Sequence, residues 1–346
     1  MPNQHNIEAP VILISMQRSG TTLVHDIFRR HPDFNVVGET ANLIFGIWHA
    51  VESTHNITSP LIEAGVSIPC EEKAVRIVRQ AILTSFPADK PRWFQKPIGI
   101  PTVLGAKFDQ TQWAEAGEWY WNVLAKAFPK AKYFAVLRHP CDVVLSCESF
   151  LGYETAGYWW SLACLASLLT HPASPVKYVI HYEDLVRHKE EVVRELFEFL
   201  EVPFDQKVLN AFAAAHAPSK GREKPGQTSL TRRDEWAQLD PTKTTPFYIE
   251  KINELFAQFG YPLEWPSHFT TENMAVAKAE DPQQTIQKLN RQIETLHFDY
   301  LSKIQNFYQM PLWRLAQKYL AYKYNLLKGK TLAKANHVYE SLAWKR

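Results

Sequence analysis

The five residues Arg18-Ser19-Gly20-Thr21-Thr22 place a guanidinium, three hydroxyls and a glycine in one short stretch. The β-branched apolar run Val11–Ile14 precedes them and is typical of a strand buried on both faces of a parallel sheet. A helical pattern begins at Thr22. The turn between strand and helix would present backbone N–H groups and hydroxyls at a helix N-terminus, where phosphate is the usual ligand. The alternative is an ordinary strand–turn–helix junction.

The loop lacks the lysine that P-loop enzymes acting on ATP have at this place. A Walker A loop reads G-x-x-x-x-G-K-[ST], and its lysine reaches the β- and γ-phosphates. Here Ser15 stands at the first glycine position, and Arg18 is followed by Ser19-Gly20-Thr21 with no lysine. The pattern therefore favours anion binding and disfavours a nucleotide kinase or NTPase.

The residues that follow extend this loop into a recognisable motif. His31-Pro32 comes after the predicted helix, and Glu39-Thr40 follows a second apolar run. From Met16 to Thr40 the chain resembles the 5′-phosphosulfate loop of sulfotransferases that use PAPS (3′-phosphoadenosine-5′-phosphosulfate). The matching branch contains tyrosylprotein and many bacterial sulfotransferases.

This resemblance implies a role for each residue of the motif. The run Ser19 to Thr22 would donate hydrogen bonds to the 5′-phosphate, and Arg18 would neutralise charge on the transferring and leaving groups. Glu39 would be the general base that takes the proton of the acceptor hydroxyl. A solvated loop carboxylate is the alternative for Glu39.

A second segment supports the same family independently. Arg138-His139-Pro140-Cys141-Asp142 follows an apolar strand pattern, and Ser146 comes one to two helical turns later. An arginine and a serine so spaced can converge on one phosphate. Alone, an Arg-His-Pro turn is more often plain structure. In the sulfotransferase family this pattern binds the 3′-phosphate of PAPS, so the resemblance implies that role for Arg138 and Ser146.

The resemblance also implies roles for three further residues. Tyr182, in a Tyr-Glu-Asp-Leu run after another strand pattern, would lie near the 3′ side of the nucleotide. Lys96, followed by Pro97, resembles the lysine that supports the bridging oxygen and the leaving phosphate; a surface lysine is the alternative. Arg233 occupies the place of a late basic residue that reaches the 3′-phosphate, and a solvated basic loop is the alternative there.

The acceptor is constrained by one departure from the family pattern. Tyrosylprotein sulfotransferases have an arginine two residues beyond the catalytic glutamate, where this chain has Ala41. A peptidyl-tyrosine acceptor is thus disfavoured, and a glycan or small-molecule alcohol is expected. Aromatic residues that could be core or could line an acceptor cleft are dense in one region: Trp113, Trp119, Tyr120, Trp121, Tyr158, Trp159 and Trp160.

Alternating strand and helix patterns predict the fold. Strands are expected at Val11–Ser15, Phe34–Val37, Arg92–Lys96, Tyr133–Leu137 and Lys177–Tyr182, and helices include Thr22–Arg30, Ala114–Phe128, Tyr158–Leu169 and Lys189–Leu200. Such alternation indicates an α/β, three-layer fold with a mainly parallel sheet, like that of P-loop NTPases. Ligands then lie at the carboxyl ends of the strands.

The chain changes character after Pro266. We expect residues 1–266 to form the sulfotransferase domain, 267–281 a linker and 282–346 a helical extension. Apolar residues at heptad-like intervals from Ile286 to Phe307 predict a helical hairpin packed on the catalytic domain or on a second subunit. A short coiled coil that joins a homodimer, or a basic aromatic helix on a membrane surface, are the alternatives.

Composition bounds the remaining possibilities. The net charge of +2 gives no electrostatic case for nucleic acid or an anionic membrane. The four cysteines include no C-x-x-C pair, so free buried thiols in a reducing compartment are expected. The N-terminus has no signal-peptide or membrane-spanning pattern, which favours a cytoplasmic protein. No metal is expected, since Lys96, Arg18 and loop N–H groups would do the neutralising.

The sequence therefore predicts a sulfotransferase that moves a sulfuryl group from PAPS to a hydroxyl acceptor. Two other functions stay open at this point. One is an ATP-dependent P-loop phosphotransferase. The other is a catalytically silent nucleotide-binding scaffold that acts through its C-terminal helices.

Overall fold

The computed structural model describes residues 9–63, 69–85, 89–151, 155–210 and 231–274. Contacts divide the chain into two compact units, Met1–Ala277 and Lys278–Arg346. Everything below concerns the described residues of the first unit. The predicted C-terminal extension, with its possible dimer interface, lies outside the described residues.

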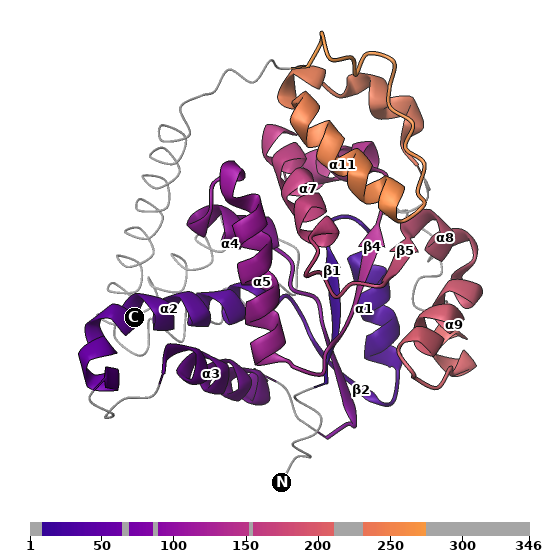
Figure 1. Cartoon of the computed structure of the whole chain (residues 1–346). Coiled ribbons are helices and arrows are strands. Elements are labelled where there is room, and N and C mark those ends of the chain that lie inside the picture. Colours follow the sequence, from indigo (N-terminus) through magenta and orange to yellow (C-terminus); the bar gives the residue numbers. More distant parts are fainter. Residues whose placement is uncertain (1–8, 64–68, 86–88, 152–154, 211–230, 275–346) are drawn as a thin grey trace, which may run out of the picture. The chain divides into compact units, whose positions relative to one another are not determined.

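A single parallel sheet forms the centre of this unit (Figure 1). Its strands are β1 (Val11–Ser15), β2 (Phe34–Val37), β3 (Arg92–Gln95), β4 (Lys132–Leu137) and β5 (Tyr178–His181). They lie in the order β2-β3-β1-β4-β5, and all four neighbouring pairs are parallel. The predicted parallel α/β architecture is confirmed.

Helices connect consecutive strands, as parallel pairing requires. The α-helices are α1 (Thr21–Arg30), α2 (Ala41–Glu63), α3 (Cys70–Ser85), α4 (Ile100–Lys107), α5 (Trp113–Ala127), α6 (Pro140–Leu151), α7 (Thr155–Thr170), α8 (Tyr182–Arg187), α9 (Lys189–Phe199) and α11 (Pro246–Gln258). Short 3₁₀ helices are η2 (Gln110–Gln112), η3 (Arg233–Gln238) and η4 (Pro241–Lys243).

Strand β1 shows why the fold has three layers. Its side chains alternate between faces. Val11 and Leu13 pack in a cluster with residues of α1 and α9, whereas Ile12 and Ile14 pack in a cluster with residues of α5 and α7. Figure 1 shows α1, α8 and α9 on one side of the sheet and α5 and α7 on the other. Since both faces are covered, the strand is apolar throughout, as its sequence indicates.

The packed region extends beyond Pro266. Helix α11 packs on α7, and the chain then returns along it through residues 265–274. Phe269 and Met274 are buried, and the Phe269 ring lies 5.7 Å from that of Trp159. Residues 267–274, expected to be linker, therefore belong to the packed unit, and residues 275–281 lie outside the described part of the chain.

Two general expectations can be compared with this unit. Cys141, Cys147 and Cys164 are free and buried, as predicted, and Cys70 is free and partly exposed. No described helix is both long enough and apolar enough to cross a membrane.

The junction between β1 and α1 depends on glycine at position 20. Gly20 has φ +94°, a left-handed conformation that glycine adopts without strain. A Cβ atom here would also lie 2.4 Å from Cδ2 of Tyr182, which begins α8. The absence of a side chain therefore lets the Tyr182 ring close against the loop.

We expect Gly20→Ala to lower the free energy of unfolding by about 2–5 kcal/mol. Left-handed strain costs about 1–2 kcal/mol, and displacing the ring adds an overpacking cost of about 1–3 kcal/mol. Urea denaturation measures the change. Gly46→Ala in α2 is the matched control, because its Cβ would meet no atom within 4 Å. Equal stability of the two variants would contradict this account of the junction.

Candidate functional site

The carboxyl ends of all five strands carry residues that the sequence selected. Glu39 follows β2, Lys96 follows β3, the loop with Arg18 follows β1, Arg138 follows β4 and Tyr182 follows β5. Because the strands are parallel, these five positions lie at the same end of the sheet, the carboxyl-terminal ends of its strands. The strand order places Glu39 and Lys96 on one side of the β1 loop, and Arg138 and Tyr182 on the other.

The β1 loop is shaped to receive an anion. Gly20 caps α1 with no side-chain hydrogen bond, so it does not occupy the N–H groups of the first turn. Ser19 and Thr21 are buried, and Thr22 is exposed. Arg18 has φ 65°, in the left-handed region where a non-glycine residue is strained. Such strain persists only where neighbouring groups hold the backbone in place.

Arg138 supplies that support. Its Nη1 donates a hydrogen bond to the carbonyl oxygen of Arg18 over 3.2 Å. The guanidinium also lies 4.5 Å from the ring centre of Tyr182 and 3.7 Å from the carboxylate of Asp142. Arg138 is buried, and its Nε has no hydrogen-bond partner among the described residues. Arg138 therefore stabilises the backbone of the Arg18 loop, and its buried Nε is a donor without a partner among the described residues.

The side chain of Arg18 turns toward α6. Its Nε donates to Oγ of Ser146 over 3.1 Å, and its guanidinium lies 4.2 Å from the ring centre of Phe150. Phe150 is 68% exposed, the most exposed of the large apolar residues described. Arg18, Ser146, Arg138 and Tyr182 therefore come together in the structure. The guanidinium of Arg18 lies on the Ser146 side of the loop and not beside Lys96.

Glu39 and Lys96 lie together on the other side of the β1 loop, after β2 and β3. Lys96 Nζ lies 3.7 Å from a Glu39 carboxylate oxygen. Contacts between the two strand ends hold them: Thr40 Oγ1 donates to Gln95 Oε1 over 2.6 Å, and the Lys96 amide donates to the Gly38 carbonyl. The Lys96 side chain is 11% exposed and that of Glu39 is 62% exposed. A shielded ammonium therefore stands beside a carboxylate that solvent can reach.

Arg233 lies apart from these groups. Its guanidinium pairs with the carboxylate of Glu264 and is 65% exposed. The preceding residue, Arg232, faces α6 instead, where its Nη1 donates to Ser149 Oγ over 3.1 Å. Of the two arginines, Arg232 thus lies nearer the residues around Ser146.

Asp142 is a residue whose role the sequence did not reveal. It is fully buried, and its Oδ1 accepts hydrogen bonds from Trp236 Nε1 (2.6 Å) and the Arg232 amide (3.0 Å). Together with its ion pair to Arg138, these bonds fasten η3 to the end of β4. The aspartate in the R-H-P-x-D motif was the available signal, but its partners are 90 and 94 residues away in sequence.

The dense aromatic residues divide into core and partly exposed groups. Five are buried: Trp113, Tyr120, Trp121, Tyr158 and Trp159. Trp119 and Trp160 are only partly buried. Both lie against α4, the helix that begins soon after Lys96: Trp119 lies under the Lys107 ammonium, and Trp160 packs where a Cβ on Gly105 would be.

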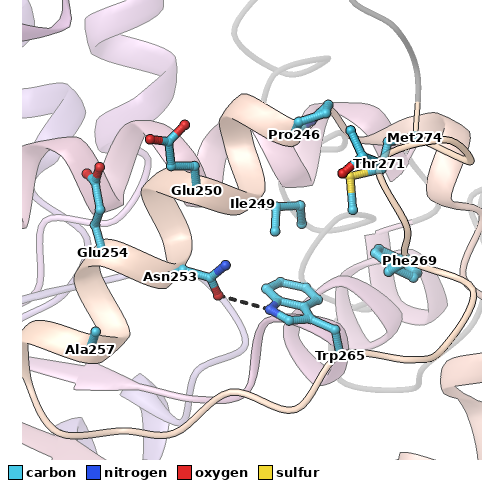
Figure 2. A pocket seen from close by; sticks show the side chains of 10 residues that line it. All are labelled: Pro246, Ile249, Glu250, Asn253, Glu254, Ala257, Trp265, Phe269, Thr271 and Met274. Carbon is cyan, nitrogen blue, oxygen red and sulfur yellow. Dashed lines mark hydrogen bonds between the residues drawn. The ribbon is translucent and has the colours of Figure 1, made fainter.

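An open pocket of about 610 Å³ lies between α11 and the returning chain (Figure 2). Asn253 and Trp265 face each other across it, with Trp265 Nε1 donating to Asn253 Oδ1 over 2.9 Å. None of the sequence-predicted site residues lines it.

Comparison with known proteins decides the family. The sequence model described as "Sulfotransferase family" matches residues 10–206, which include all five strands and every sequence-predicted site residue except Arg233. The chain belongs to the sulfotransferase family.

Two curated relatives match this chain at 25% identity, each over 60% of the chain. One is an uncharacterized protein of Aquifex aeolicus, of which 27% is covered, and the other is protein-tyrosine sulfotransferase 1 of Danio rerio, of which 58% is covered. The chain thus spans less than two thirds of either relative. Among solved structures, the sulfotransferase domain of the Synechococcus PCC 7002 olefin synthase aligns over 76% of this chain and 99% of its own, with 19% identity and a TM-score of 0.44.

His139 is a titratable group packed beside Arg138 at the end of β4. The ring stacks on Trp236 with centres 4.1 Å apart, and Nε2 lies 3.1 Å from the Glu264 carbonyl oxygen. Burial lowers the pKa of His139 to about 4, while the Asp142 carboxylate opposes this shift. The imidazole is therefore neutral at neutral pH and packs as an uncharged ring.

We expect His139 to make the protein less stable in acid. As pH falls from 7 to 5, the unfolded state gains a proton at this residue and the folded state does not. The free energy of unfolding should therefore fall by roughly 2 kcal/mol from this residue alone. Urea denaturation at both pH values, in wild type and His139→Phe, measures it.

The comparison isolates His139 because other groups titrate in both proteins. Burial raises the pKa of Glu183, and this shift acts in the opposite direction on stability. His139→Phe should lose about that much of the wild-type pH dependence. His188→Ala, on the exposed start of α9, should keep it. An unchanged pH dependence in His139→Phe would refute the expectation.

Proposed function

We propose that this protein transfers a sulfuryl group from PAPS to the hydroxyl of a small-molecule alcohol or a glycan. The observation that supports it most is the shared edge of the sheet. An anion-binding loop there is flanked by a buried arginine on one side and by a lysine–carboxylate pair on the other. PAPS carries one phosphate on the 3′ position of its ribose and another on the 5′ position. Two separate cationic regions, one on each side of the loop, suit such a ligand.

The residues present fit such a nucleotide. The uncapped start of α1 and the side-chain-free Gly20 leave backbone donors for a 5′-phosphate. The buried Nε of Arg138, unbonded among the described residues, is a donor in need of an acceptor. With Ser146 nearby, Arg138 would hold the 3′-phosphate, and Tyr182 supports Arg138 from the opposite face.

The chemistry is divided between the lysine and the carboxylate. PAPS supplies the activated sulfuryl group and a phosphate leaving group. Lys96 neutralises the negative charge that develops on the bridging oxygen, as a preorganised cation in a shielded position. Glu39, which is exposed to the acceptor, takes the hydroxyl proton as the acceptor oxygen bonds to sulfur.

The arginines contribute according to where their side chains lie. Arg18 reaches the transferring group only when its guanidinium turns away from Ser146, a side-chain rotation that leaves the loop backbone in place. On the 3′ side, Arg232 is better placed than Arg233 to add a further contact, because it faces α6 while Arg233 is paired with Glu264.

The acceptor side of the proposal rests on the neighbourhood of Lys96 and Glu39. Ala41 is buried at the start of α2, so no basic group stands there to hold an acidic peptide. Trp119 and Trp160, which contact α4, are only partly buried. Such rings suit the apolar face of a sugar or an aromatic alcohol.

We test the proposal by incubating the protein with ³⁵S-labelled PAPS and a panel of alcohols and oligosaccharides. Wild type should transfer label to at least one acceptor. Glu39→Gln should lower kcat by a factor of about 100 or more, since it removes the general base. Glu118→Gln, on the exposed face of α5, should retain full activity. Full activity of Glu39→Gln would remove Glu39 from this role.

A second prediction concerns the 3′ side. Arg138→Ala should weaken binding of PAP (3′-phosphoadenosine 5′-phosphate) by roughly 10- to 150-fold, the value of a hydrogen-bonded charge pair. Binding of adenosine 5′-phosphosulfate, which has no 3′-phosphate, should change far less. Calorimetry with both ligands measures the ratio. Equal losses would show that Arg138 acts on the β1 loop alone.

A further inference from the structure

His25 lies beside the lysine–carboxylate pair, although no motif selected it. It is on α1, one turn after Thr21, and is half-buried. Its ring meets Phe94 of β3 edge-on, with centres 6.1 Å apart, and Phe94 comes two residues before Lys96. Helix α1 covers β2 and β3, so this face of the helix is directed toward the strand ends that bear Glu39 and Lys96.

Several charged groups surround His25. Burial lowers the pKa of His25, and the Lys96 ammonium lowers it further, as does Arg29. The carboxylates of Asp26 and Glu39 oppose this. His25 is therefore a neutral imidazole at neutral pH, influenced by both members of the pair.

The imidazole is also unbonded. Within the described part of the chain, neither nitrogen of His25 makes a hydrogen bond. The buried histidines differ: His31 Nε2 lies 3.1 Å from the Pro203 carbonyl oxygen, and His139 Nε2 lies 3.1 Å from that of Glu264. A half-buried imidazole without a partner, next to an ammonium, is a hydrogen-bond acceptor available to that ammonium.

The proposed chemistry creates a need for such an acceptor. While Lys96 remains 3.7 Å from Glu39, the two charges stabilise each other, and the carboxylate is a weaker base. For transfer, Lys96 must turn to the leaving oxygen and Glu39 must face the acceptor. An ammonium with three donors in a shielded position then requires a new partner in place of the carboxylate.

We propose that His25 is a positioning residue whose imidazole accepts a hydrogen bond from Lys96 during transfer, and so separates Lys96 from Glu39. This inference rests on the proposed function. No bond in His25 is made or broken: its lone pair accepts the ammonium proton without taking it. A protonated His25 cannot do this, because it has no lone pair and it repels Lys96.

The first test does not depend on activity. The Cε1–Hε1 NMR signal of His25, assigned as the one missing from His25→Gln, is followed against pH in three proteins. In wild type it should titrate below the ordinary value of 6.5. Lys96→Met should raise the midpoint, and Glu39→Gln should lower it. An unchanged midpoint in Lys96→Met would overturn the proposal, since His25 would then not lie beside Lys96.

Kinetics provide the second test. His25→Ala should lower kcat about 10-fold, the value of one hydrogen bond to a charged group, with the Kd for PAP unchanged. His25→Gln should recover most of this loss, because the amide oxygen also accepts. His188→Ala is the matched control and should behave as wild type. A merely structural role would predict no recovery in His25→Gln.

The pH profile separates the two proposals. The acid limb of kcat in wild type should include the His25 titration, and it should be absent from His25→Gln. Wild-type kcat and an unchanged acid limb in His25→Ala would refute the role of His25 and leave the proposed function intact. Wild type without any transfer would refute the proposed function, and the role of His25 with it.

Discussion

The buried guanidinium of Arg138 is the interaction on which the site depends. A buried charge is costly unless it is paired and hydrogen-bonded. Arg138 meets this requirement with the Asp142 carboxylate, the Arg18 carbonyl oxygen and the Tyr182 ring. Each of these partners belongs to a different element, so one side chain joins the β1 loop to α6 and to the start of α8. The strained backbone of Arg18 is one consequence, because it is held from outside the loop.

The parallel sheet explains why two motifs far apart in sequence act together. Arg18 and Arg138 are 120 residues apart, yet β1 and β4 are neighbours with their ends at the same edge. The opposite neighbour of β1 is β3, which brings Lys96 to the other side of the loop. A loop in the middle of the sheet therefore has a cationic residue on each side, which suits a ligand with separated anionic groups.

The sequence predicted the strands well, because a buried parallel strand has a strong apolar signal. Val11–Ser15 and Phe34–Val37 were predicted with the observed bounds. The third strand ends at Gln95, one residue before its predicted end, since β2 pairs with it only as far as that residue. Lys96 therefore follows directly after the end of β3, where its amide still donates to the Gly38 carbonyl.

What the sequence did not reveal depends on contacts between distant segments. The motif position of Arg233 predicts a contact with the 3′-phosphate, but the carboxylate of Glu264 decides where its side chain lies. The buried network of Asp142 with Trp236 spans 94 residues. His25 lies one turn beyond the motif on α1, and only the packing of that helix on β3 brings it to Lys96. Local patterns cannot predict such pairings.

The most direct measurement is a pair of calorimetric titrations of the purified protein, one with PAP and one with ATP plus magnesium. The account predicts a micromolar Kd for PAP, about −8 kcal/mol, and much weaker binding of ATP, because the β1 loop has no Walker lysine and Arg138 has its buried Nε available for a 3′-phosphate. A preference for ATP with magnesium would contradict the account and indicate a phosphotransferase. Binding of neither would contradict it as well and indicate a scaffold.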